Sequence, residues 1–109
     1  ITPRTRMMLI NSPHNPSATV WTREEMLALQ EILEPTSIIL LSDEVYEHMV
    51  YAPLKHLSVA SFPKLAQRAF VISSFGKTYH VTGWKVAYCA APLPSPRNTA
   101  RCINSMSSR

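Results

Sequence analysis

Short apolar runs that end in polar clusters recur along this sequence and restrict the folds open to it. Each run has the length of a strand and is too short for a buried helix. The segment 37–42 (SIILLS) is continuous enough to predict a strand covered on both faces of a sheet. The predicted strands are 6–10, 37–42, 69–73 and 85–90.

One helix is predicted between the first two strands. Thr22 followed by Glu25 is a capping-box pattern, which starts a helix over 23–33, and Pro35 ends it. A short second helix is expected near 64–67. Strands separated by a helix or a long crossover predict an α/β fold with a partial, mostly parallel sheet. The predicted buried face of the first helix is Met26, Leu29, Ile32 and Leu33.

The composition fits one small globular domain and argues against several classes of protein. The chain has 109 residues, of which 46% are apolar, and no apolar run reaches the ~20 residues of a membrane helix. We therefore expect no membrane partner. Cys89 and Cys102 lack a paired spacing and are predicted to be free thiols in a reducing, cytoplasmic compartment. The histidines stand singly, so we predict no metal site.

The polar residues that follow the predicted strands are expected to meet. Asn15 follows the first strand, and Asp43 and Tyr46 follow the second. Ser74 and Lys77 follow the third. Because the carboxyl ends of parallel strands lie at one edge of a sheet, where α/β folds bind ligands, these groups would line one crevice.

These side chains fit the chemistry of pyridoxal phosphate. A buried carboxylate such as Asp43 would keep the pyridine nitrogen protonated. The Asn15 amide and the Tyr46 hydroxyl could donate hydrogen bonds to the phenolic oxygen. The Lys77 amine could form a Schiff base with the cofactor and then move a proton.

The phosphate of that cofactor needs hydroxyl and cationic partners, which Ser74 and Lys85 could supply.

The sequence GKT at 76–78 also matches the end of a nucleotide-binding P-loop. That motif requires a glycine five positions before Gly76, and Val71 stands there. We therefore reject the nucleotide-binding interpretation.

Motifs in this order resemble those of the class I/II, fold-type I aminotransferases. They are NP at 15–16, SDEVY at 42–46 and SSFGKTYHVTGWKV at 73–86. The similarity covers roughly residues 5–94, and the wording is similar to the branch with bacterial methionine aminotransferases and kynurenine–oxoglutarate transaminases. It implies that 1–94 are part of the large, cofactor-binding domain of the aspartate-aminotransferase-like fold.

The resemblance implies a role for each matching residue. Lys77 is implied as the catalytic lysine that binds the cofactor, and Asp43 as the partner of the pyridine nitrogen. Tyr46 and Asn15 are implied as partners of the phenolic oxygen. At position 85 many relatives have arginine, which binds phosphate in a bidentate manner that lysine lacks. The implied phosphate ligands are Ser74 and Lys85.

Two alanines depart from the family pattern. The pair Ser17-Ala18 replaces the more general Thr-Gly, and Ala87 stands where the family has glycine. If the glycine at 87 marks a positive φ or a close approach of backbones, the methyl group of Ala87 costs about 1 kcal/mol.

The resemblance implies an enzyme that transfers an amino group from a methionine-like or aromatic amino acid to a 2-oxo acid. The parent enzyme would be a homodimer. Cysteine-conjugate β-elimination is an alternative with the same cofactor, and a non-catalytic truncated remnant is the alternative for the chain itself. The substrate-binding arginine of the family has no counterpart here, so we expect no activity from the isolated chain.

The segment 95–109 differs from the rest of the chain. It contains Arg97, Arg101 and Arg109 without an acidic residue and so holds +3 of the net charge of +4. Since 1–94 have no basic stripe, we expect no nucleic-acid partner. A shifted reading frame would give this segment a family-like sequence, and we interpret it as a frameshifted, disordered tail.

Overall fold

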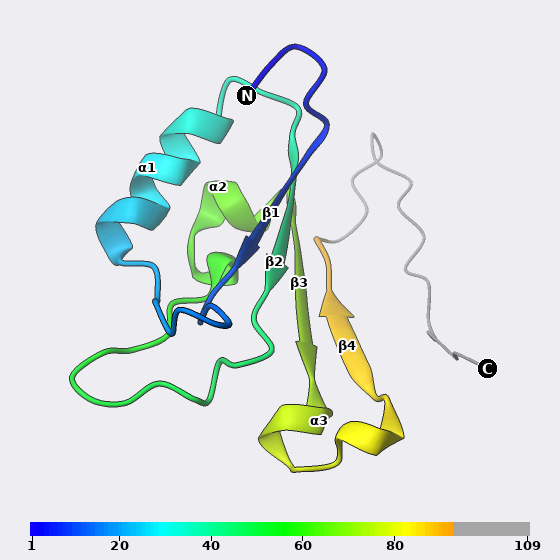
Figure 1. Ribbon diagram of the computed structural model, residues 1–109. Coiled ribbons are helices and arrows are strands. Elements are labelled where there is room, and N and C mark those ends of the chain that lie inside the picture. The colour runs from blue at the N-terminus through cyan, green and yellow to red at the C-terminus, as the bar shows by residue number, and fades with distance from the viewer. Residues whose placement is uncertain (93–109) are drawn as a thin grey trace.

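The structure, a computed structural model, describes residues 1–92 around a four-stranded sheet of order β1-β2-β3-β4 (Figure 1). β1, β2 and β3 run parallel, and β4 is antiparallel to β3. The predicted mostly parallel sheet is confirmed. The predicted tail, 95–109, lies outside the described residues. The strands are β1 (Met7–Asn11), β2 (Ile39–Asp43), β3 (Ala69–Ser74) and β4 (Ala87–Ala90).

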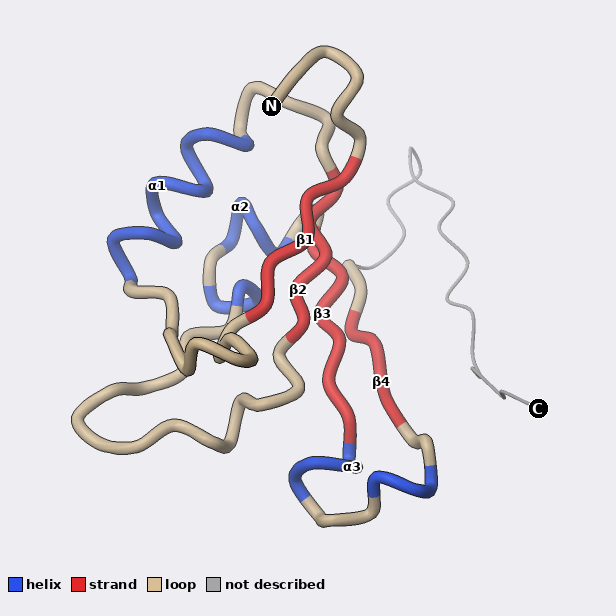
Figure 2. Tube along the Cα trace, in the orientation of Figure 1, coloured by secondary structure: helices blue, strands red, loops and turns tan. Residues whose placement is uncertain are grey.

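The connections between strands explain their directions (Figure 2). A chain must cross back over the sheet to add a parallel strand, and it does so through helical segments twice. Only short helical turns separate β3 from β4, so β4 returns antiparallel. The helical elements are α1 (Arg23–Leu33), the 3-10 turn η1 (Val59–Ser61), α2 (Pro63–Ala66), α3 (Phe75–Thr78) and the 3-10 turn η2 (Thr82–Trp84).

α1 begins and ends where the sequence predicted. Glu25 donates its backbone N–H to the Thr22 hydroxyl at 3.2 Å, and Thr22 donates its own N–H to the Glu25 carboxylate at 2.7 Å. These reciprocal bonds satisfy amides that have no partner within the helix. The predicted capping box is therefore confirmed.

The predicted apolar face of α1 was wrong at one position. Met26, Leu29 and Leu33 are buried, whereas Ile32 is 54% exposed. Successive helical residues are separated by about 100°, so Ile32 lies beside the stripe that Leu33 completes. Ile32 is therefore not part of the core cluster of the described residues.

The core lies between the helices and one face of the sheet. Figure 1 shows α1 and α2 on the same side of the strands. Leu40 of β2 is fully buried, and so are Leu33 of α1 and Leu65 of α2. Alternate strand residues point to this face, which is why Leu40 packs here and its neighbour Ile39 does not. The other core residues are Ile10, Met26, Leu29, Ile38, Val59, Phe62, Ala69 and Val71.

The opposite face of the sheet is apolar and open in the described part of the chain. Met7 and Leu9 of β1 are 55% and 63% exposed, and Ile39 of β2 is also exposed. The prediction that 37–42 is buried on both faces was therefore wrong, because helices cover only one face. The observed β2 begins two residues later than the predicted strand 37–42 and ends one residue later, so that it includes Asp43.

Candidate functional site

Asn11 fixes the loop that carries Asn15. Its side-chain amide donates to the carbonyl oxygen of Asp43 at 3.0 Å, and its side-chain oxygen accepts the backbone N–H of Asn15 at 3.0 Å. The register of β1 and β2 pairs Asn11 with Asp43, so these bonds close the sheet at its carboxyl end. Sequence reasoning overlooked Asn11, although a polar residue at the end of an apolar strand is a usable signal.

Three of the predicted site residues converge at this edge of the sheet. The Asn15 side-chain amide donates to the Tyr46 hydroxyl oxygen at 3.2 Å. The Lys77 ammonium nitrogen lies 6.0 Å from the centre of the Tyr46 ring. An amine from α3, a phenol from the loop after β2 and an amide from the loop after β1 therefore lie together, which is part of the larger group that the sequence predicted.

Asp43 occupies the end of β2 and is half-buried. One of its carboxylate oxygens accepts the backbone N–H of Val45 at 3.2 Å, which starts the turn that leads to Tyr46. Asp43 thereby sets the direction of the chain between the strand and Tyr46.

Ser74 and Lys85 lie at the same end of the sheet. Ser74 ends β3 and pairs with Ala87 of β4. Lys85 lies two residues before Ala87 in the chain. Within residues 1–92, neither side chain makes a hydrogen bond or ion pair with the Asn15–Tyr46–Lys77 group. The sheet therefore places these two residues at the same end as that group without joining them to it.

Gly76 permits the tight turn around Lys77. A β-carbon at Gly76 would lie 3.1 Å from the Cα of Thr82, closer than ordinary contact. The Thr82 hydroxyl donates to the carbonyl oxygen of Gly76 at 3.2 Å, which holds η2 against α3. A side chain at position 76 would push η2 away from α3, the turn that carries Lys77.

The two unusual alanines differ in conformation. Ala18 has φ 56°, in the left-handed region that favours glycine, so its methyl group is strained there. Ala87 has no positive φ and lies exposed in β4. The condition for strain at Ala87, a positive φ, is therefore not met there, whereas Ala18 in the loop next to Asn15 has one.

Glu44 is a buried carboxylate that the sequence prediction did not single out. Its side chain is 1% exposed and accepts hydrogen bonds from Ser42 at 2.9 Å, His56 at 2.8 Å and the backbone N–H of Val59 at 3.1 Å. Burial alone would raise the pKa of Glu44, but the hydrogen bonds from His56, Ser58, Val59 and Ser42 outweigh it and lower the pKa. Glu44 thus ties the loop after β2 to η1.

Glu47 joins the same loop to β3 and β4. One carboxylate oxygen accepts the Ser73 hydroxyl at 2.7 Å and the Tyr88 hydroxyl at 2.9 Å. The Ser73 hydroxyl lowers the pKa of Tyr88. The hydrogen bond to Glu47, burial and the charges of Glu47 and Glu44 outweigh that effect and raise the pKa. Sequence reasoning missed this contact as well, because it depends on pairing across distant segments.

Glu44, Glu47 and His56 place potential metal ligands within 4.8 Å of one another. Glu44 and His56 bind each other, and Glu47 binds Ser73 and Tyr88. We interpret the group as a hydrogen-bonded network that holds the loop after β2. The predicted lack of a metal site stays a prediction.

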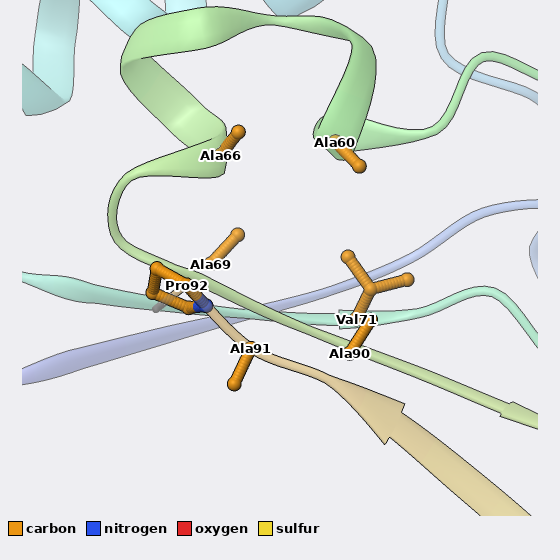
Figure 3. Close-up of a pocket in the computed structure, with 7 residues that line it drawn as sticks. All are labelled: Ala60, Ala66, Ala69, Val71, Ala90, Ala91 and Pro92. Carbon is orange, nitrogen blue, oxygen red and sulfur yellow. The ribbon is translucent and has the colours of Figure 1, made fainter. Parts of the chain in front are cut away.

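A small apolar cavity of about 230 Å³ lies elsewhere, between the η1–α2 segment and the edge of β3 and β4 (Figure 3). None of the predicted cofactor residues lines it. Its walls carry no polar side chain to orient a ligand, so we do not place the functional site there. The lining residues are Ala60, Ala66, Ala69, Val71, Ala90, Ala91 and Pro92.

A family model described as aminotransferase class I and II matches residues 1–109. The chain belongs to this family. The methionine aminotransferase of Escherichia coli K12 is 53% identical over 91 residues, which are 84% of this chain and 24% of that protein. Human kynurenine–oxoglutarate transaminase 3 is 40% identical over 89 residues, which are 82% of this chain and 20% of that protein.

Solved structures confirm the fold. The Escherichia coli methionine aminotransferase YbdL superposes with a TM-score of 0.81 at 51% identity, over 84% of this chain and 24% of that one. For the Thermus thermophilus aspartate aminotransferase the TM-score is 0.76 at 33% identity, over 84% of this chain and 23% of that one. The chain thus spans between a fifth and a quarter of the length of these aminotransferases. No helix among residues 1–92 is long and apolar enough to cross a membrane.

Proposed function

We propose that the parent enzyme of this chain transfers an amino group between an amino acid and a 2-oxo acid, and that Lys77 binds the cofactor. The observation that carries the proposal is the position of the Lys77 ammonium over the ring of Tyr46, whose hydroxyl is hydrogen-bonded by Asn15. A lysine held beside polar donors in the aminotransferase fold suits covalent binding of an aldehyde cofactor.

The residues at the sheet edge fit pyridoxal phosphate. When bound, the cofactor supplies an electron sink for the carbanion of the substrate. The Tyr46 oxygen accepts from Asn15, so the Tyr46 hydroxyl hydrogen remains available for an acceptor such as the phenolic oxygen of the cofactor. The Asp43 carboxylate would hold the proton of the pyridine nitrogen.

The remaining groups would bind the phosphate and move protons. The Ser74 hydroxyl can donate to a phosphate oxygen, and the Lys85 ammonium can neutralise its charge. The Lys77 amine would hold the cofactor before the substrate arrives and would then carry a proton between substrate and cofactor carbons. Each role uses a side chain at the carboxyl end of the parallel strands, where α/β folds bind ligands.

The substrate class follows from the relatives. One of them is named a methionine aminotransferase and another a kynurenine–oxoglutarate transaminase, so we propose a methionine-like or aromatic amino acid for the parent enzyme. We also propose a cytoplasmic homodimer. The chain alone spans about a quarter of these relatives, and we expect it to bind cofactor without turnover.

The test is a titration of the chain with pyridoxal phosphate, followed by absorbance of the protein-bound cofactor. The Lys77→Arg variant should lose the absorbance change. The Lys55→Arg variant alters an exposed lysine and should keep it. Equal titrations of the Lys77→Arg variant and the natural chain would contradict the proposal. On the full-length parent enzyme, product analysis would distinguish amino-group transfer from β-elimination.

A further inference from the structure

Glu47 connects three segments that carry or adjoin the proposed cofactor residues. It follows Tyr46 directly in the loop after β2. Its carboxylate accepts from Ser73 in β3 and from Tyr88 in β4, and those two residues are register partners across the strands. One oxygen atom therefore holds the loop against both strands.

The contact is buried where it meets β3. Ser73 is 1% exposed, and the Glu47 side chain is 23% exposed. The buried Ser73 hydroxyl donates to the Glu47 carboxylate, and the loss of a charged acceptor costs free energy, so this bond constrains the position of Glu47. Ser74 comes next in the chain, and α3, which carries Lys77, begins one residue later.

The negative charge of Glu47 lies close to other charged or titratable groups. The Glu44 and His56 ligand atoms are within 4.8 Å of it, and the His48 ring nitrogen is 3.9 Å away. A carboxylate near the buried Glu44 experiences like-charge repulsion, which hydroxyl donors offset. An apolar residue at position 47 would avoid this repulsion but would remove the carboxylate to which both hydroxyl groups donate.

We propose that Glu47 is a positioning residue, which fixes the Tyr46 ring relative to the Lys77 amine by tying the loop after β2 to β3 and β4. The inference rests on the proposed function, because it assigns Glu47 a role in the geometry of that cofactor site. Glu47 does not itself touch the cofactor. It acts through its neighbour Tyr46 and through the Ser73–Tyr88 pair.

The experiment compares Glu47→Ala with Glu47→Gln in the full chain. The glutamine keeps an oxygen that accepts hydrogen bonds, so it should restore what the alanine loses. For Glu47→Ala we expect the Kd for pyridoxal phosphate to rise on the order of tenfold. A displacement of the binding side chains by about 1 Å is enough to weaken the contacts that they make with a ligand. The pH midpoint of the bound-cofactor absorbance should move as well.

A second measurement does not need the cofactor. Competitive acetylation of the free chain, read by mass spectrometry, gives the reactivity of Lys77 relative to the exposed Lys55. This ratio should change at least about twofold in Glu47→Ala, since the Tyr46 ring beside the Lys77 amine shifts, and should return toward its original value in Glu47→Gln. Glu25→Ala, which removes one of the two capping bonds of α1, should reduce stability and leave both readouts unchanged.

The outcomes separate the two proposals. If the natural chain binds pyridoxal phosphate at Lys77, and Glu47→Ala changes neither the Kd nor the Lys77 reactivity, the positioning role is overturned and the proposed function stands. If the natural chain fails to bind the cofactor while the Lys77 reactivity still depends on Glu47, the positioning role stands and cofactor binding by the chain fails. Equal losses in Glu47→Ala and Glu25→Ala would overturn the positioning role.

Discussion

The apolar core and the carboxyl end of the sheet are built on different principles. In the core, alternate strand residues such as Leu40 and Val71 pack against α1 and α2 and are buried. At the carboxyl end, carboxylates and amides hold the loops, and a residue such as Ala18 has a strained backbone. Burial of apolar area stabilises the first region, whereas directional hydrogen bonds shape the second.

This difference teaches where stability and chemistry reside in the chain. Apolar residues of the core determine whether the sheet forms, and they can be exchanged for others of similar volume. The side chains at the carboxyl end are held in a fixed arrangement even where the backbone is strained, as is common at functional sites. Substitutions in the two regions should therefore affect different measurements.

The largest effect is expected for Leu40→Ala in the core. Leu40 is fully buried, so its truncation should lower the free energy of unfolding by about 2–5 kcal/mol and is expected to unfold much of a marginally stable chain. Leu9→Ala removes the same atoms from a side chain on the open face, 63% exposed, and should cost under about 1 kcal/mol. Denaturant titration compares them, and equal losses would refute the one-sided core.

Acid should act on the carboxyl end through Glu44. The pKa of Glu44 is lowered below its usual value of 4.5, so the folded chain binds this proton less readily than the unfolded chain does. Its contribution to stability is present above pH 4.5 and is lost as the pH falls through the lower, folded-state pKa.

Glu44→Gln tests this dependence. The variant should be less stable than the natural chain at pH 7, and the difference should narrow as the solution is acidified. Denaturant midpoints at successive pH values between about 7 and 3 measure it. Glu31→Gln, on the exposed side of α1, should follow the natural chain at every pH. If the difference in stability between Glu44→Gln and the natural chain stays constant over this pH range, Glu44 does not contribute to acid unfolding.

A smaller effect, of opposite sign, is expected at Ala18. Glycine adopts a positive φ without the strain of a β-carbon, so Ala18→Gly should stabilise the chain by roughly 0.5–1 kcal/mol. Ala28→Gly makes the same chemical change inside α1 and should destabilise by about 1 kcal/mol. Thermal unfolding compares the melting temperature of each variant with that of the natural chain. A lower melting temperature for Ala18→Gly would show that the loop is unstrained.

The smallest change in stability is expected at Lys77. Lys77→Met keeps an unbranched side chain and removes a partly exposed charge over the Tyr46 ring, so the free energy of unfolding should change by about 0.5 kcal/mol or less. Denaturant titration measures it beside a cofactor titration, which the same variant should abolish. A loss of stability comparable to that of Leu40→Ala would make Lys77 a structural residue.

Local signals in the sequence predicted α1, the strands and the convergence of Asn15, Tyr46 and Lys77. The capping box needs only residues within one helical turn, and the polar residues at strand ends need only the rule that parallel strands open at one edge. The exposure of Ile32 and the open face of β2 could not be predicted this way. They depend on which elements happen to cover each surface.

The carboxylate network was also beyond local reasoning. Glu47 reaches Ser73 and Tyr88, which lie far away in the sequence, and Glu44 reaches His56 across a long loop. A buried charge can be recognised from the sequence only if its partners are known, and these partners are brought together by strand register. Sequence analysis therefore assigned no role to Glu44 or Glu47.

The most direct test of the central claim is borohydride reduction of the chain in the presence of pyridoxal phosphate, followed by peptide mapping. Reduction makes the bond between lysine and cofactor permanent, so mass spectrometry identifies the residue. The account predicts an adduct on Lys77 and none on the exposed Lys55. An adduct on another lysine, or label spread evenly over the exposed lysines, would contradict it.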